Sequence, residues 1–228
     1  MTFADKVITF NKELSLSTNL PFEIVAMNPF IDNALVIPSM EEFYKAFYND
    51  NNGRYLIVGI NPGRLGAGVT GIPFTDTKRL QSVCNIDWNH KETYEPSSEF
   101  IYEVINNYGG AARFYSKYYI NSVCPLGFIR QSPKGNWTNC NYYDYPELFQ
   151  SVKPFIVRSL KKQIAFGCST DRIFILGKKN AKFFNKINNK EKLFDRVETL
   201  PHPRYIMQYK RVDIDKFITS YCSIFKDL

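Results

Sequence analysis

Residues 55–74 read YLIVGINPGRLGAGVTGIPF, and this stretch decides the fold that we predict. The aliphatic run 56–60 is typical of a buried strand, and it ends at Asn61-Pro62-Gly63, which is a strong turn signal. In open α/β sheets, ligands bind in the crevice outside the carboxyl ends of the strands. We therefore expect Asn61 to stand beside a ligand.

The rest of the chain alternates between strand and helix patterns. Further strands are predicted over 118–123, 172–177 and 196–200, and helices over 3–15, 40–50, 77–84, 98–108, 145–166, 178–188 and 209–225. This alternation predicts a three-layer α/β/α sandwich with a central, mainly parallel four-stranded sheet. No internal repeat, linker or low-complexity tract divides the chain, so residues 1–228 are expected to form a single domain.

Some local signals make more detailed predictions. Thr2 is suited to cap the first helix, and Ser39 followed by Glu42 has the spacing of a capping box for a helix beginning near residue 40. Residues 130–141 are rich in Gly, Pro and Asn. That composition predicts a loop.

The composition is that of a globular, basic protein. Hydrophobic residues make up 44% of the chain, and 29 Lys and Arg against 22 Asp and Glu give a net charge of +7. Residues 158–192 alone hold ten basic and two acidic side chains, a net charge of +8. A basic surface favours a polyanionic partner such as nucleic acid, although mild basicity is common in soluble proteins.

The cysteines carry no metal or disulfide signature. The five are separated by 40, 16, 28 and 54 residues, without a CxxC pair or a His at ligand spacing: Cys84, Cys124, Cys140, Cys168 and Cys222. This spacing argues against zinc, an iron–sulfur cluster and a disulfide framework, and predicts reduced, mostly buried thiols. The N-terminus has no signal-peptide pattern and no run is long enough to span a membrane, so a cytoplasmic location is expected.

Polar residues follow three of the predicted strands. Asn61, Asn121 and His202 lie at or just beyond their ends, and parallel strands bring their carboxyl ends to one edge of a sheet. Phe74 lies thirteen residues after Asn61, at the end of a loop that contains four glycines. An Asn amide pairs with the donor–acceptor edge of a nucleobase, and an aromatic ring stacks on its face. Alone, an Asn before Pro is usually a turn former and a His between prolines is usually structural, so the combination carries the prediction.

Three segments resemble one family in the family's order. Residues 59–74, GINPGRLGAGVTGIPF, resemble the first motif of the uracil-DNA glycosylase superfamily, most closely that of its single-strand-selective monofunctional branch. Residues 121–126, NSVCPL, are similar to its Asn-x-x-Cys-Pro-Leu segment, and residues 200–203, LPHP, to the start of its last motif. The resemblance spans roughly residues 54–217. It departs from the pattern after His202, where the DNA-inserting loop is two residues shorter.

The resemblance implies a monofunctional DNA glycosylase that flips out and hydrolytically excises uracil, starting base excision repair. In this family Asn61 would position the attacking water, His202 would stabilise the departing base, and Asn121 would read its edge. Phe74 would stack on the ring, Pro62 and Gly63 would line the pocket, and the space beside Gly63 would admit 5-hydroxymethyluracil. No metal or cofactor is expected. Because the three motifs contain no Lys, neither a Schiff base nor strand cleavage is expected.

The expected partner is single- or double-stranded DNA, bound by a monomer without a membrane. Arg204 and Tyr205, with 206–207, are candidates to fill the gap left by the flipped base. In the alternative, Tyr205 and Ile206 merely pack beneath the last helix. Lys178 and Lys179 either contact phosphates or form a solvated face.

Two other functions remain open from the sequence. A catalytically silent module would recognise uracil or abasic sites with the same pocket. A small-nucleotide enzyme is disfavoured because 63–68, GRLGAG, lacks the lysine and the order of known phosphate loops.

Overall fold

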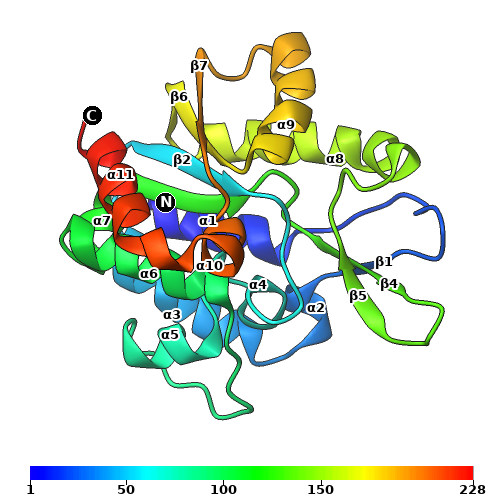
Figure 1. Cartoon of the computed structure of the whole chain (residues 1–228), viewed down its shortest axis with the longest axis horizontal. Helices are drawn as coiled ribbons and strands as arrows, with labels where there is room; N and C mark the ends of the chain where they lie inside the picture. The colour runs from blue at the N-terminus through cyan, green and yellow to red at the C-terminus, as the bar shows by residue number, and fades with distance from the viewer. Residues whose placement is uncertain (228) are drawn as a thin grey trace.

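The four buried strand patterns form one parallel sheet in the order β3-β2-β6-β7. The computed structural model describes residues 1–227. The strands are β2 (Arg54–Gly59), β3 (Tyr118–Ser122), β6 (Cys168–Leu176) and β7 (Arg196–Leu200). Helices flank both faces of this sheet (Figure 1), as the sequence predicted.

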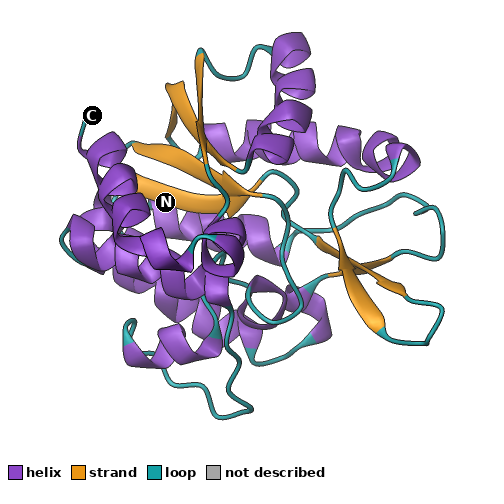
Figure 2. Ribbon diagram, viewed as in Figure 1, coloured by secondary structure: helices purple, strands orange, loops and turns teal. Residues whose placement is uncertain are grey.

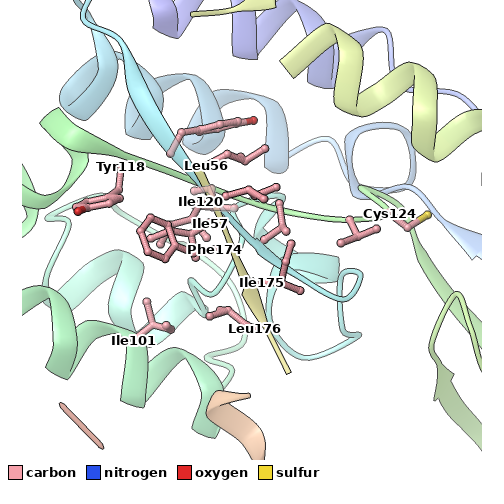
Figure 3. Packing of buried hydrophobic residues seen from close by; sticks show 14 of the residues in the cluster. Leu56, Ile57, Ile101, Tyr118, Ile120, Cys124, Phe174, Ile175 and Leu176 are labelled. Atoms are coloured by element: carbon pink, nitrogen blue, oxygen red, sulfur yellow. The ribbon is translucent and has the colours of Figure 1, made fainter. Parts of the chain in front are cut away.

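The two faces of the sheet bury different aromatic clusters, because successive residues of a strand point to opposite faces. On one face Tyr119 packs against Phe3 of α1 (Phe3–Lys12), with ring centroids 5.3 Å apart, and against Tyr48 of α3 (Val36–Tyr48). On the other, Tyr118 packs against Phe225 of α11 (Ile214–Lys226), 4.9 Å away. Figure 3 shows the side chains of β2, β3 and β6 packed together in this core.

The remaining helices connect the strands. They are α2 (Pro29–Asp32), α4 (Ala67–Thr70), α5 (Thr77–Ser82), α6 (Pro96–Tyr108), α7 (Ala111–Lys117), α8 (Pro146–Ala165), α9 (Lys178–Glu191), α10 (Pro203–Tyr209) and a 3₁₀ turn at Arg211–Asp213. Pro154 lies inside α8 without ending it.

The predicted cap of the first helix is confirmed, and the second is wrong. Thr2 Oγ1 accepts from the Asp5 N–H and the Asp5 carboxylate accepts from the Thr2 N–H, which forms a capping box. Ser39 instead lies buried inside α3, which begins at Val36. Pro38 falls in the first turn of that helix, where a missing N–H costs nothing.

The prediction that residues 130–141 form a loop holds for the turn at 132–136 and is wrong for the strands on either side of it. These strands are β4 (Gly127–Gln131) and β5 (Trp137–Cys140), which pair as an antiparallel hairpin beside β1 (Val25–Met27). Figure 2 shows this second sheet apart from the parallel one. Most of β5 is exposed and polar, so its sequence carries no alternation of apolar residues.

The C-terminal prediction also changes. The helix expected over 209–225 begins only at Ile214, and residues directly after His202 form the separate helix α10. Within residues 1–227 no helix is both long and apolar enough to cross a membrane. The same residues hold no group of three or more potential metal ligands, and all five cysteines are unpaired and buried.

Candidate active site

A pocket of about 170 Å³ lies beyond the carboxyl ends of β2 and β7. The segment after β2 supplies one wall and the start of α10 another. Its lining residues include six of the sequence candidates: Asn61, Pro62, Gly63, Phe74, His202 and Arg204. The carboxyl edge of the sheet therefore brings together residues that are up to 143 positions apart in the chain.

Both the oxygen and the nitrogen of the Asn61 side-chain amide form hydrogen bonds. Its Oδ1 accepts a hydrogen bond of 3.0 Å from the Tyr142 N–H, and its Nδ2 donates to the Cys140 carbonyl oxygen at 3.2 Å. Cys140 ends β5, so the hairpin that the sequence did not reveal holds this side chain in place. An amide oxygen has two lone pairs, which leaves Asn61 Oδ1 able to accept one more hydrogen bond.

Asn180 extends this network beneath the site. This fully buried residue of α9 accepts a hydrogen bond of 2.9 Å from the Tyr142 hydroxyl and donates to the Gly59 carbonyl oxygen at 3.0 Å. The Asn180 amide is thus hydrogen-bonded both to the end of β2 and to Tyr142, the residue whose N–H binds Asn61. Sequence analysis missed Asn180 because it stands among lysines in a helix that we interpreted only by its charge.

His202 is held as one defined tautomer. It caps α10, and its Nδ1 accepts a hydrogen bond of 3.1 Å from the Arg204 backbone N–H. A nitrogen that accepts carries no proton, so the proton of the neutral ring is on Nε2. Burial, helped by the charge of Arg204, lowers the pKa of His202 to about 4. His202 is therefore a neutral donor at physiological pH.

Phe74 lies directly over the end of β2. A Cβ atom on Gly59 would stand 2.7 Å from Cε2 of the Phe74 ring, so only glycine leaves the ring this position. Phe74 also has a positive φ of 52°, which is strained for a bulky residue. Its ring centroid lies 6.1 Å from that of His202. The fold thus holds an aromatic ring at the pocket at a cost in backbone strain.

Asn121 is not among the residues that line this pocket. It points to the opposite sheet face from its neighbour Ser122, which does line it. Asn121 borders a small adjoining cavity whose wall, formed by Pro62, Ala67 and Pro73, is shared with the pocket. Its Nδ2 donates to the Tyr119 hydroxyl at 2.7 Å. Its role as the base-reading residue stays a prediction.

Glu95 is a pocket residue that sequence analysis missed. Its carboxylate lies against the Gly-rich loop: a Cβ atom on Gly63 would be 3.6 Å from Oε1, and one on Gly66 would be 2.0 Å from Oε2. Burial, together with the negative charge of Asp76, raises the pKa of Glu95 to about 7, although Arg204 opposes this shift. Glu95 lies in a polar connection that offered no motif. It lies 36 positions after the end of β2 and 23 before the start of β3, so no strand end marked it as a candidate.

Comparison with known proteins identifies the family of the chain. Residues 46–226 match the model of the family described as the Uracil DNA glycosylase superfamily. The chain belongs to the uracil DNA glycosylase superfamily. The crystal structure of wild-type Pedobacter heparinus SMUG2 superposes with a TM-score of 0.97, at 51% sequence identity, covering 100% of this chain and 98% of that chain. No curated protein matches the chain.

These comparisons confirm the predicted superfamily, fold class and enzyme class. The parallel sheet with its flanking helices is the uracil-DNA glycosylase fold, and the chain is a uracil-DNA glycosylase by family.

The predicted DNA-contacting residues of this uracil-DNA glycosylase differ in exposure. In α10, Arg204 and Tyr205 are exposed, whereas Ile206 and Met207 are buried, so the alternative of packing in the core fits Ile206 and not Tyr205. In α9, Lys178 and Lys179 are exposed, and the ammonium of Lys179 lies 3.6 Å from the Asp144 carboxylate and 4.8 Å from the centre of the Tyr143 ring.

Proposed function

We propose that the protein is a monofunctional DNA glycosylase that flips uracil out of DNA and hydrolyses its glycosidic bond, leaving an abasic site for base excision repair. The observation that carries this proposal is the tautomer of His202. Its Nε2–H is directed by the hydrogen bond at Nδ1, in a pocket that also holds Asn61 and Phe74. A neutral, oriented donor is what a departing base anion requires.

The glycosidic bond breaks as negative charge gathers on the base and the sugar becomes cation-like. His202 would donate its Nε2–H to the uracil O2, where that charge develops. One such oriented donor is typically worth roughly 3–4 kcal/mol of barrier. Its low pKa keeps the Nδ1 acceptor free of a proton, so the orientation holds across the physiological range.

The remaining candidates bind the base. Phe74 would stack on the uracil ring while Pro62 lines the pocket beside it. Asn121 would read O4 and N3–H from the adjoining cavity, with a rearrangement of the shared wall as the base enters. An Asn side chain offers the matching acceptor and donor.

Gly63 favours a second substrate, 5-hydroxymethyluracil. A methyl-sized group at Gly63 would make only ordinary contacts, 3.6 Å from Glu95 Oε1 and 3.7 Å from Asn139 Nδ2. A polar C5 substituent would find hydrogen-bonding atoms in that space, whereas the methyl group of thymine would not. We expect faster release of 5-hydroxymethyluracil than of thymine.

Flipping costs a few kcal/mol in duplex DNA and less in single strands. The exposed Arg204 and Tyr205 at the pocket rim are our candidates to occupy the vacated stack. Lys178 and Lys179 would contact phosphates. We further propose that the protein acts as a single-domain monomer in the cytoplasm.

A panel of oligonucleotides tests this function. Each carries one modified base, either uracil, 5-hydroxymethyluracil, thymine mismatched with guanine, hypoxanthine or xanthine, in single- and double-stranded form. Alkali converts abasic sites into strand breaks, and a sample without alkali detects any lyase activity. We expect alkali-dependent cleavage at uracil and none without alkali.

The same panel separates the enzyme from a silent binding module. A module would retain uracil-containing DNA in a binding assay without releasing base. His202→Ala should lose base release while it still binds uracil-containing DNA. If the protein releases no base from any of these oligonucleotides, the proposed activity is wrong.

A further inference from the structure

Glu95 occupies a position where a helix cap is expected, yet its side chain does not cap. It is the N-cap residue of α6, and no side-chain hydrogen bond closes that helix end. Its backbone N–H donates to Asp76 Oδ2 at 2.7 Å, and its carbonyl oxygen accepts from the N–H groups of Ser98 and Glu99, so only the carboxylate is without a hydrogen bond. N-cap carboxylates usually turn inward to bind the free N–H groups of the first turn. The Glu95 side chain instead points to the Gly-rich loop and the pocket.

Within residues 1–227, Glu95 is the one acidic side chain that lines the pocket. None of the hydrogen bonds or ion pairs among these residues involves its carboxylate oxygens. Oε2 stands where a Cβ atom on residue 66 would be, so the carboxylate in this position occupies the space that Gly66 leaves open. A partly buried acid without a partner costs stability, so its retention in the pocket calls for a function.

Asn61 leaves one step of the reaction, the removal of a proton from the attacking water, to another residue. Its amide is neutral and is committed to Tyr142 and Cys140 of the hairpin segment. It can hold a water molecule through its free lone pair, but an amide has almost no affinity for a proton. The water that attacks the sugar must give up a proton, and Asn61 cannot take it.

We propose that Glu95 is the general base of this glycosylase and that Asn61 only positions the water. This inference rests on the function proposed above. The water oxygen forms a bond to C1′ of the deoxyribose while the bond from C1′ to the base breaks, and its electron pair leaves with the base. One proton of the water passes to the Glu95 carboxylate. The base anion is held by the Nε2–H of His202 and is later protonated from solvent.

The surroundings of Glu95 fit this role. With a pKa of about 7 it is a stronger base than an ordinary carboxylate, and about half of it is ionised at neutral pH. The charged and titratable groups that face it from neighbouring elements are Asp76 and Arg79, which form an ion pair, and Arg204, Arg211 and His202. His202 titrates near 4, so Glu95 is the group expected to govern activity between pH 5.5 and 8.

Single-turnover release of uracil tests this inference. The probe is a labelled single-stranded oligonucleotide with one uracil, mixed with excess enzyme between pH 5.5 and 9 and quenched with alkali. The variants are Glu95→Gln, which keeps size and removes basicity, and Glu95→Asp, which keeps a carboxylate. Glu92→Gln is the matched control, because Glu92 is an exposed acid in the same connection. Binding of the same oligonucleotide is measured for each.

We expect the wild-type rate to rise about tenfold per pH unit below 7 and to level above it. Glu95→Gln should lower the rate at pH 8 by about 10²- to 10⁴-fold, flatten the pH profile and leave binding within a few-fold. Glu95→Asp should keep a sloping profile, and Glu92→Gln should match the wild type.

Two results would overturn the proposed role of Glu95 but not the glycosylase activity. One is a wild-type rate of uracil release that does not change from pH 5.5 to 8. The other is a Glu95→Gln rate within threefold of the wild-type rate. Both leave the proposed glycosylase intact, since uracil is still excised. Absence of release from the wild type would remove both proposals. If Glu95→Gln does not fold, the wild-type pH profile and Glu95→Asp still decide.

Discussion

Asn61 Oδ1 accepts a hydrogen bond of 3.0 Å from the backbone N–H of Tyr142, a residue 81 positions further along the chain. This bond joins the end of a central parallel strand to the small antiparallel sheet. The position of the site's first polar residue is therefore set by a hairpin outside the main fold. Loss of this bond should affect both chemistry and stability.

Asn61→Ala should lose base release yet keep binding to uracil-containing DNA, because the water would no longer be positioned while the base-binding groups remain. The change also removes two hydrogen bonds, each worth about 0.5–1.5 kcal/mol. Urea unfolding should therefore show a loss of stability of about 1–3 kcal/mol. Asn107→Ala is the control, since it removes one exposed bond to the Glu103 carbonyl oxygen. Normal release by Asn61→Ala would contradict this role.

Gly59→Ala should reduce uracil release and uracil-specific binding at least tenfold. The new Cβ would stand 2.7 Å from the Phe74 ring, so the ring must leave its place over the strand end. Gly53→Ala is the matched control, because the nearest atom to its Cβ would be 3.5 Å away, an ordinary contact.

A double-mutant cycle identifies the cause of this loss. If Gly59→Ala acts through the Phe74 ring, its effect should largely vanish in a Phe74→Leu background, because neighbouring residues in one contact are not additive. Full additivity of the two changes would show that Gly59→Ala acts by another route.

The elements that could be predicted most directly are those whose residues are buried. β2, β3 and β6 contain aliphatic and aromatic runs that are buried in the sheet. β7 is mostly exposed, and its place in the strand–helix alternation, just before Pro201-His202-Pro203, marked it as a strand. Asn61 and His202 could be identified because each of them follows a predicted strand.

The missed parts of the site have polar, exposed or solitary sequences. β5 is mostly exposed, so no periodicity marks it, although its last residue holds Asn61. Glu95 is one acid among several in a polar connection, and only the fold places it against the loop of Gly63 and Gly66. Ser39 is the opposite case, because its sequence carries a capping signal that the structure does not use. The residue is packed inside α3.

Glu95→Gln should stabilise the protein above pH 7 and have little effect below pH 4.5. The pKa of Glu95 is raised from its ordinary value of 4.5 to about 7 in the folded state, so the folded state binds more protons than the unfolded state between these values. Stability therefore falls as pH rises from 4.5 to 7, and glutamine removes this fall.

Urea unfolding at half-unit pH steps measures the difference between the two proteins. The pH dependence that His202 contributes is common to both and cancels. A difference that is independent of pH would show that Glu95 has the same pKa in the folded and unfolded states, against the expected shift.

Lys178→Glu should weaken DNA binding and lower the slope of log Kobs against log salt by about one, because each phosphate contact releases about one counterion. Lys178 is exposed at the start of α9, which follows the strand beside the pocket. Lys117→Glu, exposed at the end of α7 beside the amino end of β3, changes the net charge equally and should leave the slope nearly unchanged. Lys179→Glu also disrupts the ion pair with Asp144, so its effect would be harder to assign to a phosphate contact. Equal effects of the Lys178 and Lys117 changes would show that net charge, not a local phosphate contact, governs binding.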